Sequence, residues 1–219
     1  PATPATGAQA GSAAQGTGTV AAVPAAEVTA QSFTLETEVY RVVFSNRGGV
    51  VTSLQLKDYK NLDGSPVEMV FSKDTGRYPF SIHFGDADAP PVNELFQFER
   101  SSVGNAVSFY RTFASTSGVP FVLRKTYQFQ PADYLIELRV SIENSVNEYP
   151  ALKFGDLAYT LGFGPQIGPP FEKLDRYTET RQYMYFAEGK PRSANPKNGR
   201  LALNGRVTWA GIMGKYFEV

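Results

Sequence analysis

Cysteine is absent from the 219 residues, and histidine and tryptophan occur once each. The missing cysteine excludes disulfides, thiolate metal sites and cysteine nucleophiles. The single histidine, His83, excludes a two-histidine zinc motif and leaves one histidine for a Ser-His-Asp arrangement, with no GxSxG elbow to accompany it. A metal site normally needs several converging ligands, so we expect His83 to have a structural role on a strand face.

The formal net charge is zero, because 21 Lys and Arg residues balance 21 Asp and Glu residues. Nucleic-acid binders usually carry a basic excess, so the balance argues against a nucleic-acid partner. No apolar run approaches the roughly 18 residues of a membrane span, and no basic-then-apolar signal peptide is visible. We therefore expect the chain as given to be soluble.

Residues 1–30 have almost no core-forming side chains and consist mainly of Ala, Gly, Thr, Pro, Gln and Ser. Such a segment buries too little apolar surface to fold and is typical of a flexible tether. We predict a low-complexity linker over residues 1–30, attached to another domain or an anchor, and a folded domain over residues 31–219.

Aromatic residues are plentiful, with 16 Phe and 12 Tyr, and they favour sheets. Short alternating runs predict strands at 33–37, 39–45, 50–56, 67–71, 79–84, 95–100, 106–114, 152–163, 176–187 and 206–213. Turns are predicted at Asn46-Arg47-Gly48-Gly49 and across the polar residues 58–66. Helical periodicity is scarce and indicates only a short helix at 214–219 and a helical turn at 170–177. The pattern predicts an all-β, mainly antiparallel sandwich.

The clearest pattern is a long antiparallel hairpin at residues 121–144. Side chains in a strand alternate between two faces, and this alternation is regular on both sides of the turn at Pro131-Ala132-Asp133. After the turn, one face carries Tyr134, Ile136, Leu138, Val140 and Ile142, and the other carries Leu135, Glu137, Arg139, Ser141 and Glu143. Before the turn, Phe121, Leu123, Tyr127 and Phe129 share a face that only Lys125 interrupts.

The remaining motifs favour structural over catalytic roles. The Gly-rich residues 162–170 lack the Lys-Ser/Thr of a P-loop, and prolines interrupt any GxGxxG, so we expect a rigid irregular loop. A pair of carboxylates could face each other across a cleft, as in a glycosidase, but sequence cannot pair them and exposed strand faces are the default. The candidates are Glu36, Glu38, Asp86, Asp88, Glu137, Glu143, Asp156, Glu172, Asp175 and Glu179.

The C-terminal third is locally basic and aromatic. A polyanion-binding surface and ordinary strand alternation both fit, and the neutral overall charge favours the second. The residues are Arg176, Tyr177, Arg181, Tyr183, Tyr185, Phe186, Arg192, Arg200 and Arg206. Trp209 suits either a membrane interface or a core, and we favour burial in the core.

Three motifs occur in a fixed order: Ser45-Asn46-x-Gly48-Gly49 with its following strand, Lys125-Thr126-Tyr127-x-Phe129, and Lys215-Tyr216-Phe217. Together they resemble the large periplasmic domain of the YidC/Oxa/Alb family of membrane-protein insertases, over roughly residues 31–219. The resemblance implies a β-supersandwich similar to galactose mutarotase-like folds, with a short C-terminal helical part near the membrane.

The resemblance also implies a function without catalysis, cofactor or metal. Insertion belongs to a transmembrane core that this chain lacks, so the domain would aid insertion as a partner-docking or scaffold module at the periplasmic face of the inner membrane. The implied partners are nascent membrane proteins and the Sec translocon, through its SecF subunit. A carbohydrate-binding or mutarotase-like sandwich is the alternative, although one histidine is too few for the usual epimerase acid and base.

Overall fold

The computed structural model describes residues 21–22, 28–71, 77–101, 105–115, 117–143, 152, 157–163, 180–196, 200–203 and 205–215. Across these residues the regular structure consists of strands, and every strand pairing is antiparallel. Within the same ranges there is no helix long and apolar enough to cross a membrane. The predicted all-β class is confirmed.

One layer of the sandwich is a four-stranded sheet in the order β2-β3-β4-β5. Its strands are β2 (Ser32–Glu36), β3 (Tyr40–Ser45), β4 (Val50–Lys60) and β5 (Pro66–Glu68). In β3 the buried residues alternate with more exposed ones, so Tyr40, Val42 and Phe44 form one apolar face. The predicted Asn-x-Gly-Gly turn joins β3 to β4, with Gly48 and Gly49 at φ of 71° and 55°.

The second layer is a five-stranded sheet in which β8 and β9 are central. Its strands are β1 (Ala21–Ala22), β7 (Gln97–Ser101), β8 (Ala106–Ala114), β9 (Pro120–Phe129) and β10 (Ile136–Glu143). The predicted hairpin is confirmed, with register partners from Ile136↔Phe129 to Glu143↔Val122. Burial alternates strictly along β9, because one face meets the core and the other is partly exposed.

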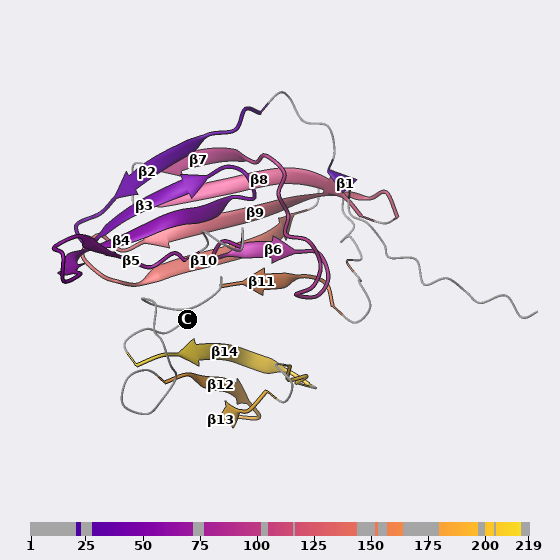
Figure 1. The fold of residues 1–219 in the computed structure, drawn as a ribbon. Helices are drawn as coiled ribbons and strands as arrows, with labels where there is room; N and C mark the ends of the chain where they lie inside the picture. Colours follow the sequence, from indigo (N-terminus) through magenta and orange to yellow (C-terminus); the bar gives the residue numbers. More distant parts are fainter. Residues whose placement is uncertain are drawn as a thin grey trace, which may run out of the picture.

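The two sheets lie face to face (Figure 1), and the core between them is rich in aromatic side chains. Phe44 of the first sheet is fully buried, and its ring centroid lies 5.6 Å from that of Phe109 and 5.1 Å from that of Tyr127 in the second. Aromatic pairs such as the edge-to-face pair of Phe44 and Tyr127 add about 0.5–1.5 kcal/mol each beyond the burial of their apolar area. The paired sheets are therefore held together mainly by Phe and Tyr side chains on facing strands.

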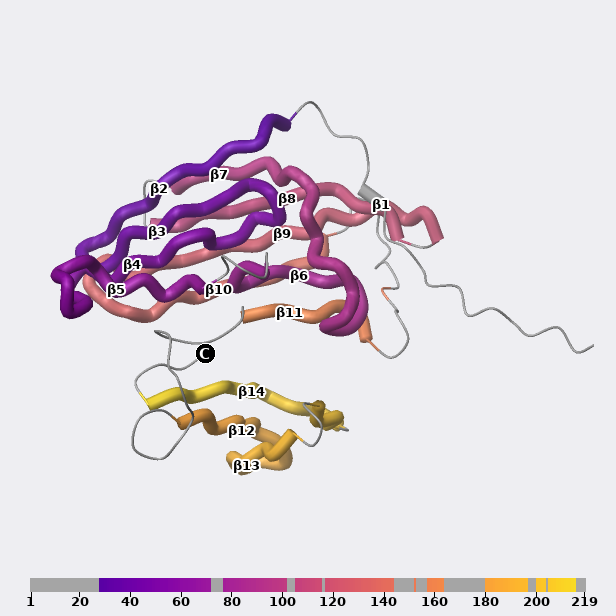
Figure 2. Tube along the Cα trace, viewed as in Figure 1, coloured from indigo at the N-terminus to yellow at the C-terminus, as the bar shows by residue number. Residues whose placement is uncertain are grey.

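Two smaller sheets complete the described structure (Figure 2). The strands β6 (Ser81–His83) and β11 (Thr160–Gly162) form a pair beside the sandwich, and Ile82 belongs to its core. The strands β12 (Gln182–Ala187), β13 (Lys190–Ala194) and β14 (Val207–Met213) form a three-stranded sheet in the order β13-β12-β14. None of the described residues of this C-terminal sheet joins the hydrophobic core cluster.

The C-terminal sheet overturns two expectations. The short helix predicted at 214–219 is not supported, because β14 stays paired with β12 through Met213 and the last described residues, Gly214 and Lys215, are not helical. The predicted burial of Trp209 is wrong: the side chain is 44% exposed, since its sheet packs apart from the main core. Its ring centroid lies 5.9 Å from that of Phe186 on the neighbouring strand.

Several predicted boundaries also shift. The strand β4 extends to Lys60, so the polar turn is confined to residues 61–65. Of the described residues within the strand predicted at 152–163, those of β11 are in a strand, and β13 was not predicted. Within the predicted linker, Ala21 and Ala22 pair with Ala114 and Phe113 of β8, and the domain boundary remains a prediction. The helical turn predicted at 170–177 and most of the Gly-rich loop lie outside the described residues.

Candidate functional site

The most unusual polar group in the described core is Lys125, which is fully buried on the inward face of β9. Its Nζ donates hydrogen bonds to the carbonyl oxygens of Gly48 at 3.1 Å, Gly49 at 2.5 Å and Phe80 at 2.7 Å. Three acceptors match the three donors of an ammonium group, which stabilises the charged form. Burial acts in the opposite direction and lowers the pKa of Lys125 to about 7.

Tyr127 lies two residues further along the same face and contacts the same turn. Its hydroxyl donates to the Gly49 carbonyl at 2.9 Å, and burial raises its pKa well above the usual value. Gly49 is required here because a Cβ atom would lie 2.9 Å from Cβ of Phe109, and a Cβ on Gly48 would lie 2.7 Å from the carbonyl oxygen of Val92. Two of the three motifs that suggested the family therefore meet at one buried cluster.

Asn46, at the start of the same turn, anchors two distant segments. Its side chain is buried; the amide nitrogen donates to the carbonyl oxygens of Thr29 and Phe96, and the amide oxygen accepts from the backbone of Gln31. A buried amide with all these partners fixes the path of the chain into β2 and β7. This motif thus has a structural explanation in full.

His83 is buried on β6, and both of its ring nitrogens are engaged. Nδ1 lies 2.6 Å from the carbonyl oxygen of Ala89, and Nε2 lies 3.1 Å from Oγ of Ser81. A carbonyl oxygen can only accept, so Nδ1 carries the proton and Nε2 accepts from the serine hydroxyl. These bonds tie the strand to its following loop, in agreement with the structural role expected for His83.

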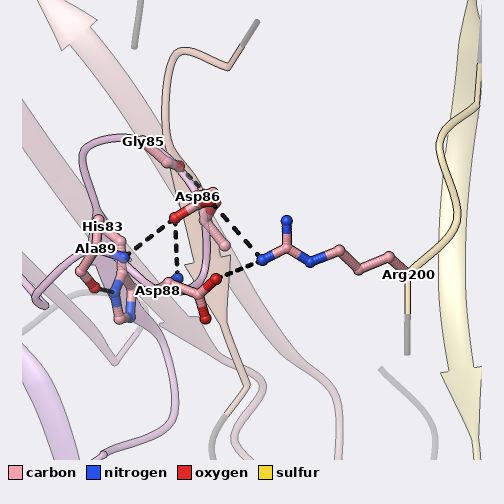
Figure 3. Close-up of polar contacts among 7 residues, drawn as sticks. His83, Gly85, Asp86, Asp88, Ala89 and Arg200 are labelled. Carbon is pink, nitrogen blue, oxygen red and sulfur yellow. Dashed lines mark hydrogen bonds and ion pairs between the residues drawn. The ribbon is translucent and has the colours of Figure 1, made fainter. Parts of the chain in front are cut away.

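The loop after His83 carries two carboxylates that meet an arginine from the C-terminal part of the chain (Figure 3). Arg200 Nη2 lies 2.5 Å from Oδ2 of Asp88 and 3.8 Å from Oδ2 of Asp86. Asp86 Oδ1 also accepts from the backbone nitrogens of Asp88 and Ala89, which closes the loop. These carboxylates shape a turn and hold an ion pair, an arrangement with a structural role.

Several of the residues singled out in the C-terminal third lie on the three-stranded sheet β13-β12-β14. Tyr183 and Tyr185 lie on one face of β12 together with Arg192, the register partner of Tyr185 on β13, and Phe186 lies on the other face, as strand alternation expects. Arg192 forms an ion pair with Glu188. Arg176 and Tyr177 lie outside the described residues, as do Asp156, Glu172, Asp175 and Glu179. Arg181 donates to the Thr180 carbonyl at 3.1 Å, whereas Arg192 and Arg200 have acidic partners.

Two adjoining surface depressions lie beside β7 and β8, and they share Val28, Gln97 and Tyr110. The second depression also contains Arg111 and Arg124. Arg111 donates to the Leu95 carbonyl at 2.5 Å, and Arg124 pairs with Glu143 at 2.9 Å while its guanidinium lies over the Tyr110 ring. Arg111, Arg124 and Tyr110 thus each make an internal contact. Across the described ranges, no group of three or more His, Asp or Glu side chains is placed to hold a metal ion.

Sequence reasoning missed the role of Lys125, which it treated as an interruption of an apolar face. The only available signal was a lysine between Leu123 and Tyr127 on a face that is otherwise core. A charged residue at such a position is almost never fully buried unless it is partnered. The partners are backbone carbonyls of distant segments, and sequence alone could not identify them.

The amino-acid sequence is similar to a known domain family and to several known proteins. Residues 32–218 match the family model described as the YidC periplasmic domain. The chain is 34% identical over 198 residues to a membrane protein insertase YidC of Treponema denticola, with 86% of this chain and 34% of the relative covered. A Treponema pallidum relative of the same name is 33% identical over 227 residues, covering 86% of this chain and 36% of the relative.

A third relative, the membrane protein insertase YidC of Syntrophus aciditrophicus, is 30% identical over 196 residues, covering 85% of this chain and 35% of its own length. The chain thus spans about a third of the length of the curated relatives it matches. Among the described strands, the family match covers every one from β2 to β14 and leaves out only β1. The chain therefore belongs to the YidC periplasmic domain family, which places it at the periplasmic face of the inner membrane.

Proposed function

We propose that this domain is a non-catalytic docking and scaffold module of a membrane-protein insertase. The observation that carries the proposal is where the family motifs lie. Lys125, Tyr127 and the two glycines of the β3–β4 turn bond to one another inside the sandwich, away from solvent. Residues that are buried and bonded to one another stabilise the fold. We therefore assign the proposed docking to residues on the surface of the domain.

The family of the relatives supplies the partners for this proposal. Nascent membrane proteins and the Sec translocon, through its SecF subunit, are the expected contacts of the longer protein, and the domain would hold or orient one of them at the periplasmic face. The engagement of both His83 nitrogens in internal bonds supports a role without acid-base chemistry.

The experiment is a binding measurement with the purified 219-residue chain. Sec translocon reconstituted in nanodiscs, with and without SecF, is immobilised, and the chain is passed over it in parallel with a glycan array. We expect saturable binding to the translocon that depends on SecF, and no binding to the glycans. Binding to glycans without binding to the translocon would replace the docking role with carbohydrate recognition.

A further inference from the structure

The β4–β5 turn meets the β9–β10 turn at one end of the sandwich (Figures 1 and 2), and the residues in and beside these two turns include four exposed large apolar side chains. They are Tyr59, Leu62, Tyr134 and Leu135, with exposed fractions of 55%, 111%, 38% and 61%. Single exposed apolar residues are common, but here the Tyr59 and Tyr134 rings lie 5.6 Å apart, Leu62 lies three residues after Tyr59, and Leu135 directly follows Tyr134. These four residues are called the tip patch below.

The β4–β5 turn holds Leu62 outward in a defined conformation. Asn61 N donates to the Ser65 carbonyl at 2.8 Å, and Gly64 N donates to the Asn61 carbonyl at 2.9 Å. Asp63 Oδ1 accepts from both the backbone nitrogen and the hydroxyl of Ser65. The loop is thus closed by its polar side chains and backbone, and the fold gains no burial from the leucine at its apex.

The two loops are joined to each other, so the patch is preorganised. The hydroxyl of Tyr134 donates to Oδ2 of Asp58 at 2.9 Å, and its ring centroid lies 5.6 Å from that of Tyr59. Tyr40 Oη donates to the Tyr134 carbonyl at 2.6 Å from beneath. Rigid aromatic groups on fixed loops lose little conformational entropy when a partner binds.

The charges around the tip patch have an acidic excess. Asp58 and Asp63 lie in or beside the β4–β5 turn, Asp133 precedes Tyr134, and Lys60 is the cation at the end of β4. Two further cations, Lys57 and Arg41, share one carboxylate, because both lie within 4 Å of Glu36, and Lys57 also donates to the Thr37 carbonyl. With this group counted, the four carboxylates exceed the three cations by one charge. An apolar patch with carboxylates at its rim favours a partner that carries apolar and basic side chains together.

We propose that the tip patch docks an apolar, basic segment of a partner protein, with Leu62 and Leu135 as anchors and the surrounding aspartates as the charged rim. The inference rests on the proposed docking function and names a surface and a partner chemistry for it. A bilayer of anionic lipid would bring phosphates against the same carboxylates, so the charge of the rim favours a protein segment over a lipid surface.

The test uses fluorescein-labelled peptides and the 219-residue chain, with fluorescence anisotropy as the readout. One peptide alternates leucine and lysine, a second replaces lysine with glutamate, and a third replaces leucine with serine. We expect only the leucine-lysine peptide to bind, with an affinity that falls as salt is raised. The double variant L62S/L135S should weaken binding by about tenfold or more, which is the size of an interface anchor.

Two further variants separate charge from contact. D58N/D63N/D133N keeps the acceptor oxygens that Tyr134 and Ser65 use, so it should weaken binding and flatten the salt dependence without altering the thermal midpoint. L201S removes a leucine that is 46% exposed in the C-terminal part and should leave binding unchanged. Equal binding of the leucine-lysine peptide by the wild-type chain and L62S/L135S would overturn the proposal, and so would equal binding of the glutamate peptide.

Sedimentation with phosphatidylethanolamine and phosphatidylglycerol vesicles distinguishes the lipid alternative. Co-sedimentation that depends on Leu62, without peptide binding, would assign the patch to the membrane and overturn the proposal. One outcome in the full-length insertase is that deletion of the domain abolishes translocon binding while L62S/L135S retains it. That result would place the docking surface elsewhere on the domain and leave the proposed function standing. If deletion itself has no effect, the proposed function fails whatever the peptides do.

Discussion

Replacing Lys125 with methionine tests which of two opposing effects controls the buried lysine. The change keeps most of the aliphatic side chain but removes the ammonium group and its hydrogen bonds to three backbone carbonyls. Gly49 keeps a second donor, the Tyr127 hydroxyl, whereas the Gly48 and Phe80 carbonyls lose the Lys125 bond. Loss of a buried acceptor's partner costs about 1–3 kcal/mol, and removal of a desolvated charge offsets part of that cost.

The pH dependence of the difference between the two proteins is the sharper quantity. Burial lowers the pKa of Lys125 from 10.5 to about 7 in the folded state. Between these values the unfolded chain binds a proton that the folded chain does not, so the stability of the wild type rises with pH in this window. Each pH unit is worth at most about 1.4 kcal/mol, so between pH 7 and pH 9 the wild type should gain about 2 kcal/mol relative to Lys125→Met.

The assay is urea unfolding of both proteins at pH 6, 7, 8 and 9, followed by tyrosine and tryptophan fluorescence. Subtracting the two free energies removes the titration of groups that both proteins share. Lys60→Met, at an exposed position on β4, is the control and should show no such pH-dependent difference from the wild type. A Lys125→Met difference that stays constant from pH 6 to pH 9 would refute the reasoning and show that the three carbonyls, not burial, set the protonation of Lys125.

Three further changes test the packing of the same scaffold. Gly49→Ala should lower the free energy of unfolding by more than about 1 kcal/mol, because φ is positive and the new Cβ would lie 2.9 Å from Phe109 Cβ. The control is Gly64→Ala, where φ is also positive but the space is open, and it should cost less in the same denaturation assay. Tyr127→Phe should cost about 1 kcal/mol by loss of one hydrogen bond to Gly49, and an unchanged denaturation midpoint would contradict the role given to that bond. Arg200→Gln should change the free energy of unfolding by less than about 1 kcal/mol, because the Arg200 and Asp88 side chains are 68% and 78% exposed. A larger loss in thermal unfolding would show that this ion pair stabilises the fold more than a surface ion pair normally does.

The elements that sequence predicted well are those whose pattern is local. Alternation along residues 121–144 identified the β9–β10 hairpin, because each side chain's face follows from its position in the strand. The β3–β4 turn was predictable for a similar reason, since two consecutive glycines permit positive φ. Tyr134 is a partial exception: it was placed on the buried face, but β10 begins at Ile136 and the tyrosine is 38% exposed in the turn.

The elements that sequence missed depend on contacts between distant segments. The exposure of Trp209 follows from the pairing of β14 with β12 in a sheet outside the main core, and no local pattern reports on that choice. The tip patch also required the structure, because Tyr59 and Tyr134 are 75 positions apart and their rings meet only when the two turns meet. The hydrogen bonds of Lys125 could not be predicted for the same reason, because their acceptors lie in distant segments.

The measurement that bears most directly on the docking role is translocon recovery from cells that express the full-length insertase. Membranes are cross-linked and the insertase is purified, either intact, without residues 31–219, or with Tyr127→Phe as a control for a change inside the fold. The account predicts that deletion sharply reduces the Sec subunits recovered with the insertase, whereas the intact protein and Tyr127→Phe retain them. Equal recovery of Sec subunits with and without the domain would contradict it.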